Sequence, residues 1–411
     1  MTATTGQRRR SSVLAVDGGE PVRHHPLPTW PRFDQEDAAL AAEVLLSGRV
    51  NYWTGDHGRA FERELADAFG CRHAVALANG TLALELALRA LEVGPGDDVI
   101  VPAATFIATA SAVVACGARP VVVDVDPDSQ CLTVDTVAPA VTPSTVAVIV
   151  VHVGGHPADA AALAAFTGAR GLHLVEDCAQ AHGARRDGRP VGSHGRVAAW
   201  SFCQDKIMTT AGEGGAITTD DPEIFRRCWE LKDHGKSHAA VHDREHPPGF
   251  RWLHDSFGTN ARMTEIQAAV GRRQLRSLAG HVSRRRAHAG VLHGALRDLA
   301  ALRLPVVPPG VEHAYYRFYA HVRPDRLRPG WDRDRVVAAV CGEGVACASG
   351  GCTEIYRERA FDRVGRPASP LPVAAALGRT SLVLPVHPAL STGDVADVVT
   401  AVRKVLGEAT A

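Results

Sequence analysis

A single lysine, Lys206, has the sequence surroundings that a covalent amine needs. It follows a short apolar run, residues 197–202, that is typical of a buried strand, and the stretch Gly212-Glu213-Gly214-Gly215 comes shortly after it. A lysine at the end of a strand, beside backbone that bends freely, can present its amine to a small molecule in a cleft. If the cleft desolvates the amine, its pKa falls, and the neutral amine can form a Schiff base with an aldehyde. The simpler interpretation is a surface lysine before a hairpin, and this stretch alone favours it.

Two adjacent carboxylates, Glu176 and Asp177, end a second apolar run that starts at residue 172. Side chains alternate along a strand, so the two carboxylates are expected on opposite sides of a sheet. Open α/β sheets bind ligands at the carboxyl ends of their strands, where Asp177 would lie. Pyridoxal phosphate needs a lysine for its aldehyde and an acid for its ring nitrogen, and Lys206 and Asp177 could supply that pair. Taken alone, Asp177 could instead be a helix cap or a turn residue.

A tight turn, Asn79-Gly80-Thr81, lies between an expected strand at residues 74–78 and an expected helix at residues 82–91. The free N–H groups and the dipole of a helix amino terminus favour a phosphate. Glycine lets the backbone approach closely, and Thr81 adds a hydroxyl donor. An ordinary turn with Thr81 as a helix cap explains the same residues equally well.

Four stretches in the same order make the chain resemble the DegT/DnrJ/EryC1/StrS family of sugar aminotransferases. They are Glu176-Asp177-Cys178-Ala179-Gln180-Ala181-His182-Gly183, Ser201-Phe202 through Lys206, Gly212-Glu213-Gly214-Gly215, and Asn260-Ala261-Arg262-Met263-Thr264-Glu265-Ile266-Gln267. With further matches upstream and downstream, the resemblance extends from about Gly18 to the last helix. It implies pyridoxal 5'-phosphate as the cofactor. It also implies the fold of type I enzymes of that cofactor, the aspartate aminotransferase fold.

The resemblance gives Lys206 and Asp177 the catalytic roles. Lys206 would hold the cofactor aldehyde as a Schiff base and later move the proton as general base and then acid. Asp177 would keep the ring nitrogen protonated, so that the ring can accept electrons.

The resemblance also implies which residues bind the cofactor. Gly80, Thr81 and Ser201 would hold the phosphate. Phe106 would stack on the pyridine ring, and Gln180 would contact the side of the ring.

A homodimer with shared active sites is implied by Asn260, whose family counterpart reaches across a dimer interface to the phosphate of the partner's cofactor. The partners expected beyond a second copy are small molecules, an amino-acid donor and a keto acceptor.

The reaction that the resemblance implies moves an amino group from glutamate or glutamine to a keto sugar, nucleotide-linked, or to a keto-cyclitol. Such reactions belong to the biosynthesis of amino sugars, aminocyclitols and the antibiotics that contain them. Residues 15–23 resemble the leader of members that act on cyclitols or aminobenzoate precursors. The nature of the acceptor therefore stays open.

Other functions were weighed against this one. Members that dehydrate sugars have histidine where this chain has Lys206, which argues against that chemistry. Members that make an aminobenzoate-type precursor by dehydration keep the lysine, so that function stays open. A non-catalytic, cofactor-binding regulator would be expected to carry an added basic DNA-reading module, which the sequence does not show. A nicotinamide oxidoreductase is disfavoured because the turn at Gly80 lacks G-x-G-x-x-G.

Strand and helix patterns alternate from residue 73 onward, which predicts βαβ units and a mostly parallel, buried sheet in an α/β, three-layer domain. Expected strands cover residues 99–101, 120–124, 146–152 and 172–176, and expected helices cover residues 105–115 and 159–166. A helix over residues 263–278 follows, with Arg284-Arg285-Arg286 on a solvated helix face. The expected division is a disordered tail at 1–14, a large domain at 15–275 and a smaller α+β domain at 276–411.

Composition excludes several classes of protein. Lysine plus arginine and aspartate plus glutamate both total 45, which argues against nucleic acid or an acidic membrane as the main partner. The nine cysteines lack C-x-x-C spacing, so no metal site is expected. Free thiols suggest a reducing cytoplasm, and the longest apolar run, residues 146–151, is too short to cross a bilayer.

Overall fold

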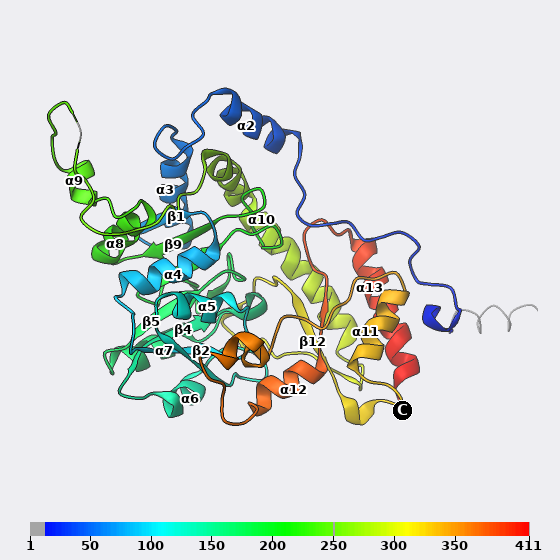
Figure 1. Ribbon diagram of the computed structural model, residues 1–411. Helices are drawn as coiled ribbons and strands as arrows, with labels where there is room; N and C mark the ends of the chain where they lie inside the picture. Colours follow the sequence, from blue (N-terminus) through cyan, green and yellow to red (C-terminus); the bar gives the residue numbers. More distant parts are fainter. Residues whose placement is uncertain (1–12, 250, 411) are drawn as a thin grey trace, which may run out of the picture.

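A seven-stranded sheet with helices on both faces organises the protein, whose computed structural model describes residues 13–249 and 251–410 (Figure 1). Its strands, in chain order, are β1 (His73–Leu77), β2 (Asp98–Pro102), β3 (Arg119–Val123), β4 (Thr145–Val151), β5 (His173–Asp177), β8 (Val197–Ser201) and β9 (Gly215–Thr219). In space their order is β1-β9-β8-β5-β4-β2-β3. The neighbours from β3 to β8 are parallel, and β9 runs antiparallel to both β8 and β1. The predicted α/β fold with a mostly parallel sheet is confirmed.

Strand β9 is a member of this sheet that the sequence analysis did not predict. All five of its residues are buried, and Gly215 pairs with Ser201 of β8. A side chain at Gly215 has no room, because its Cβ would lie 2.4 Å from the backbone of Asn79. The glycine-rich stretch was interpreted as freely bending backbone. In the fold, glycine is required at position 215 because β9 passes close to Asn79, where the helix after β1 begins.

Helices cover both faces of the sheet. In chain order they are α2 (Gln35–Leu46), α3 (His57–Phe69), α4 (Gly80–Ala90), α5 (Ala108–Ala115), α6 (Val134–Val137), α7 (Ala160–Gly168), α8 (Pro222–Lys232), α9 (His238–His242) and α10 (Glu265–Leu296). Helix α4 lies against β8, β9, α5 and α8, whereas α3 packs on α10. The side chains of β1 alternate between the two faces: Val75 and Leu77 enter the core beneath α4, and Ala74 and Ala76 enter the core beneath α3. The arrangement is the three-layer one that was predicted.

A second core lies in the carboxy-terminal part. Its elements are β10 (Leu302–Arg303), β12 (Phe318–Val322), β13 (Ser381–Leu384), α11 (Arg333–Gly342) and α13 (Thr392–Ala409). Helix α12 (Pro372–Thr380) instead packs Ala374 and Leu377 into the cores of the large sheet, and β6 (Arg185–Arg186), β7 (Arg189–Pro190) and β11 (Val311–Glu312) form a short separate sheet. Residues Ala289, Leu292 and Leu296 from the end of α10 enter the second core. Helix α10 continues unbroken through residue 275, so a domain boundary there stays a prediction. Over the residues described, no helix is long and apolar enough to span a membrane.

The leader after residue 13 packs on the second core and not on the large sheet (Figure 1). Leu14 is buried, and the Glu343 carboxylate accepts the N–H groups of Ala15 at 2.9 Å and Val22 at 3.1 Å. Arg23 pairs with Asp394 of α13 at 2.7 Å. Most of the tail that was expected to be disordered, residues 1–12, lies outside the described residues.

Arg285 corrects the expectation that Arg284-Arg285-Arg286 lies on a solvated face. Its side chain is buried, and its guanidinium donates to the carbonyls of Tyr315 at 3.2 Å and Tyr316 at 3.3 Å. Burial lowers the pKa of Arg285 to about 9. The helix extends further than predicted, and the loop before β12 covers the face that the sequence pattern left polar.

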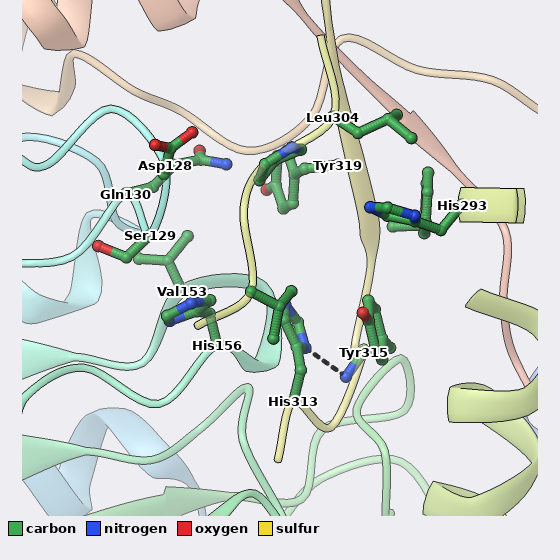
Figure 2. A pocket seen from close by; sticks show the side chains of 13 residues that line it. Asp128, Ser129, Gln130, Val153, His156, His293, Leu304, His313, Tyr315 and Tyr319 are labelled. Atoms are coloured by element: carbon green, nitrogen blue, oxygen red, sulfur yellow. Dashed lines mark hydrogen bonds between the residues drawn. The ribbon is translucent and has the colours of Figure 1, made fainter. Parts of the chain in front are cut away.

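A small cavity of about 30 Å³ lies between the large sheet and β12, and histidines line it (Figure 2). Both ring nitrogens of His156 are buried and have no hydrogen-bond partner among the described residues. Nδ1 of His313 accepts the N–H of Tyr315 at 2.8 Å, so Nε2 carries the ring proton and offers no lone pair to a metal. Burial lowers the pKa of His156 to about 4 and holds that of His313 well below its usual range, so both rings are neutral at neutral pH.

An ion pair buried between α3 and α8 anchors the edge of the sheet. Nζ of Lys232, which is fully buried, lies 3.0 Å from Glu62 and 4.0 Å from the centre of the Tyr52 ring. The same carboxylate accepts the N–H of Ala76 in β1 at 2.9 Å. Burial alone would lower the pKa of Lys232, but Glu62 and Tyr52 raise it, so the amine stays charged.

Glu62→Gln should lower the free energy of unfolding by roughly 3 kcal/mol, because it leaves a buried ammonium without its counterion. Urea unfolding followed by circular dichroism measures the change. Glu408→Gln is the matched control, since it breaks the exposed pair with Arg328 and should cost less than about 1 kcal/mol. Equal losses in the two variants would contradict the role given to Glu62.

His156 should make the protein less stable in acid. Its pKa is about 4 in the folded protein, below the ordinary 6.5, so the unfolded chain binds the proton more tightly. The loss of unfolding free energy caused by His156 is absent above pH 6.5 and grows as the pH falls towards 4, where it reaches about 3 kcal/mol. Urea unfolding at several pH values should show a shallower acid loss for His156→Gln than for the wild type; parallel curves would reject the assignment.

Candidate active site

A cavity of about 690 Å³ opens at the carboxyl ends of β2, β4, β5 and β8. Its walls also include the start of α4 and the segment from Tyr316 to Tyr319 that leads into β12. Parallel strands bring their carboxyl ends to one edge, which is why residues far apart in sequence meet here. Seven of the eight predicted site residues line this cavity: Gly80, Thr81, Phe106, Asp177, Gln180, Ser201 and Lys206.

Asp177 is the last residue of β5, and its carboxylate is buried. One oxygen accepts the N–H of Ala179 at 3.1 Å, and the other accepts the hydroxyl of Thr109 at 3.2 Å. Thr109 is itself hydrogen-bonded to Thr105 at 2.8 Å. Burial raises the pKa of Asp177, although these donors and Lys206 act against the rise. The carboxylate is oriented by neutral donors and suits a cationic partner in the cavity.

Glu176 points to the other side of the sheet, as the alternation of the strand predicted. Its carboxylate accepts from Nε2 of His152 at 3.0 Å and from the N–H groups of Gly192, His194 and Gly195 at 2.6–2.8 Å. Burial alone would raise its pKa, but these donors hold the pKa at about 2. Glu176 therefore stabilises the turn before β8, and its carboxylate already accepts four hydrogen bonds within the protein.

Lys206 follows β8 by five residues and projects into the cavity, with 16% of its side chain exposed. Nζ lies 3.7 Å from Asp205 and 4.9 Å from the centre of the Tyr316 ring. The indole N–H of Trp30, which lies between the leader and α2, donates to the Lys206 carbonyl at 2.8 Å. Burial alone would lower the pKa of the amine, yet Tyr316, Asp205 and Asp177 raise it. The fall in pKa that desolvation would cause does not occur, because Tyr316 and the two carboxylates together outweigh it.

The start of α4 forms a cradle beside Ser201. A Cβ on Gly80 would lie 2.6 Å from Cβ of Ser201, so only glycine allows the helix to begin here. Asn79, not Thr81, caps the helix, since its side chain accepts the N–H of Leu82 at 2.9 Å. This leaves the Thr81 hydroxyl exposed beside the first N–H groups of the helix, which have no partner within it.

Phe106 and Gln180 line the cavity in different ways. The Phe106 ring is 68% exposed, which is unusual for a core residue and leaves its face open to a ligand. The Gln180 side-chain oxygen accepts the N–H of Gly154 at 2.7 Å.

Asn260 is exposed and does not line the cavity of its own chain. Its backbone pairs with Asp233, which also accepts from Arg262 at 2.6 Å and from Trp53 at 2.6 Å. The segment is therefore held firmly while the Asn260 side chain faces outward. A contact with a partner's cofactor stays a prediction.

Tyr316 and Arg317 line the same cavity and were missed by the sequence analysis. Arg317 donates to Asp205 at 3.2 Å and to the Tyr316 hydroxyl at 3.3 Å, and Tyr316 also donates to Asp205. They are 111 and 112 residues away from Asp205 in sequence. The one available signal was a carboxylate directly before Lys206, which implied a cationic or hydroxyl partner elsewhere.

These groups together can bind a flat molecule with three distinct ends. The Lys206 amine meets an aldehyde, the Asp177 carboxylate meets a protonated ring nitrogen, and the cradle at Gly80 and Ser201 meets an anion. Asp177 ends β5, and Lys206 follows β8, the strand that is hydrogen-bonded to β5 in the sheet.

Comparison with known proteins finds relatives that are aminotransferases. The profile of the DegT/DnrJ/EryC1/StrS aminotransferase family matches residues 31–403. UDP-N-acetyl-3-dehydro-alpha-D-glucosamine 3-aminotransferase of Acidithiobacillus ferrooxidans is 39% identical over 374 residues, 90% of this chain and 95% of that protein. L-glutamine:2-deoxy-scyllo-inosose aminotransferase of Streptomyces kanamyceticus is 39% identical over 342 residues, 81% of this chain and 79% of that protein.

Among solved structures, an aminotransferase from Psychrobacter cryohalolentis superimposes with a TM-score of 0.92 and 46% identity, covering 93% of this chain and all of that one. The family match spans both cores and includes the whole cavity wall from Gly80 to Tyr319. The protein belongs to the DegT/DnrJ/EryC1/StrS aminotransferase family and is an aminotransferase.

Proposed function

We propose that the protein is a pyridoxal-phosphate-dependent aminotransferase in which Lys206 and Asp177 carry the chemistry. The observation that carries the proposal is that an amine and a buried carboxylate, from the ends of neighbouring strands, line one cavity of about 690 Å³. A surface lysine before a hairpin and a turn aspartate would not meet in this way.

The residues around the cavity fit that cofactor. Gly80 and Ser201 form a cradle that a larger residue at position 80 would fill, and the start of α4 favours a phosphate there. The raised pKa of Asp177 reflects a buried carboxylate that a ring cation would neutralise. We assign the phosphate to Gly80, Thr81 and Ser201, and the ring to Asp177, Phe106 and Gln180.

When bound, pyridoxal phosphate supplies the electron sink that makes an α-proton of the amino donor removable. Lys206 then acts as the proton carrier, because its amine is the basic group of the cavity. The neutral form of the free amine would take the α-proton, and the ammonium so formed, which the raised pKa favours, would deliver that proton in the next step. The donors to Asp177 and the charge of Lys206 favour its ionised form against burial, and the carboxylate would keep the ring nitrogen protonated.

The substrates follow from the relatives. One relative is named for a nucleotide-linked keto sugar and another for L-glutamine and a keto-cyclitol. We propose glutamine or glutamate as the amino donor and a keto sugar or keto-cyclitol as the acceptor, in amino sugar or aminocyclitol antibiotic biosynthesis. The leader at residues 15–23 supports the branch that acts on cyclitols or aminobenzoate precursors.

We propose further that the enzyme is a homodimer with shared active sites. Leu46 and Phe257 are 89% and 97% exposed in the single chain, and a second copy would cover them. Asn260 faces the same solvent and would complete the partner's phosphate site. We place the enzyme in a reducing cytoplasm, where its nine free cysteines stay thiols.

Lys206→Ala should abolish the visible absorption of the cofactor bound to the lysine and lower turnover at least about 100-fold. The measurement loads the enzyme with glutamine and then offers keto sugars and inososes, following the absorbance as each acceptor returns the aldehyde form. Turnover of Lys206→Ala at the wild-type rate would reject the assignment. The acceptor that restores the aldehyde form fastest identifies the branch.

Asp177→Asn should keep the fold, since an amide accepts from Ala179 as the carboxylate does, but lower turnover about 100-fold or more. Thermal unfolding and the amount of bound cofactor separate a folding defect from a chemical one. Full activity in a folded, cofactor-loaded variant would exclude a role for Asp177.

A further inference from the structure

We propose that Asp205, held by Tyr316 and Arg317, is a positioning residue that keeps the free amine of Lys206 beside the Tyr316 wall of the cavity as an ammonium. The proposal rests on the proposed function, because it concerns the lysine that function needs. It concerns the part of the reaction in which Lys206 is not covalently engaged and must hold a proton.

The geometry around Asp205 shows a carboxylate with three partners from two parts of the fold. One oxygen lies 3.7 Å from Nζ of Lys206. The other accepts from the Tyr316 hydroxyl and from Arg317 at 3.2 Å. Tyr316 packs with Trp200 and Phe202 of the large sheet, and Tyr316 and Arg317 lie directly before β12, so the segment that joins the two cores fixes the carboxylate that faces the lysine.

Aromatic and backbone contacts fix the lysine at the same place. Nζ lies 4.9 Å from the centre of the Tyr316 ring, within the range of a cation–π contact. The Trp30 indole holds the Lys206 carbonyl at 2.8 Å. The amine is thus held between Asp205 and Tyr316 by a carboxylate and by a ring face, both of which favour its charged form.

Other charged groups near the amine do not replace Asp205. Asp177 of β5 also favours the ammonium, but it is already held by Ala179 and Thr109. Arg285 of α10, Arg317 and Tyr319 act on Asp205, Tyr316 or one another, and the neutral ring of His182 lies behind Lys206. Among these groups Asp205 is the carboxylate that pairs with Nζ.

The pairing serves the part of the proton transfer in which Lys206 holds the proton. Burial disfavours the ammonium that forms when the neutral amine takes a proton. The pair with Asp205 offsets that cost, and Arg317 shares the charge of Asp205, so the pair is weaker than one with an otherwise unpaired carboxylate. Tyr316 acts on Lys206 directly as well, and Arg317 acts through Asp205 and Tyr316.

The test measures the reactivity of Lys206 in the cofactor-free protein, so it does not depend on activity. Only the neutral amine reacts with acetic anhydride, and mass spectrometry can follow each of the four lysines of the chain separately. The rate for Lys206 is normalised to that of Lys236 in the same sample, whose side chain is 23% exposed. Labelling over a range of pH reports the pKa of the amine directly.

Asp205→Asn should raise the labelling rate of Lys206 at a fixed pH by about tenfold, because the ammonium loses its counterion. Arg317→Gln should lower the rate, since the full charge of Asp205 then acts on the amine. Glu213→Gln is the matched control: it removes a carboxylate from the same cavity wall, one that contacts Cys203 at 3.7 Å, and should leave the rate unchanged.

Wild-type labelling in a folded Asp205→Asn variant would overturn the proposal. If that variant does not fold, the Arg317→Gln result decides, and an unchanged rate there would overturn it as well. Either outcome leaves the assignment of Lys206 as the cofactor lysine untouched, because that assignment is tested by the absorbance of the loaded enzyme.

Discussion

A carboxylate buried at the end of a parallel strand is the constraint on which this active site depends. Asp177 cannot move away from the ligand edge of the sheet, because β5 is hydrogen-bonded on both sides, to β4 and to β8. Its desolvation is compensated only in part by Ala179 and Thr109. An ionised group in this position favours a cation in the cavity, and that preference selects the kind of molecule the site can hold.

The neighbouring carboxylates of Glu176 and Asp177 have different surroundings and different roles in the fold. Glu176 faces the other side of β5 and is saturated by His152 and three backbone N–H groups, which hold its pKa at about 2. Asp177 faces the cavity with neutral donors, and burial raises its pKa. Their opposite surroundings follow from the period of two along a strand, so one acid fastens a turn while the next acid is left for a ligand.

The active site also depends on contact between the two cores. The large sheet supplies Lys206, Asp177 and the cradle at Gly80, whereas Tyr316 and Arg317 come from the segment that leads into β12 of the carboxy-terminal core. Helix α10 runs without a break from one core to the other, and the segment between the leader and α2 places Trp30 on the Lys206 carbonyl. The lysine is therefore held from both sides, and its raised pKa is a property of the assembled cavity, not of either core alone.

The sequence by itself determined the architecture and predicted most of the residues that line the cavity. Alternating strand and helix patterns predicted the parallel sheet, and the order of motifs predicted that Gly80, Asp177, Ser201 and Lys206 would meet, because parallel strands end at a common edge. Strand β9 was missed, since its glycine-led segment looked like flexible backbone until the helix start at Asn79 explained why no side chain fits at Gly215.

Only the tertiary structure decided the protonation of Lys206 and the surroundings of Arg285. The sequence analysis expected desolvation to lower the lysine pKa and placed Arg285 in solvent, whereas the fold brings Asp205 and Tyr316 to the amine and buries Arg285 beneath the loop before β12. Such outcomes depend on distances between charges that are more than a hundred residues apart in the chain, as Asp205 and Tyr316 are. Local patterns carry information about nearby residues, whereas electrostatic energies depend on which distant residues the folded chain brings together.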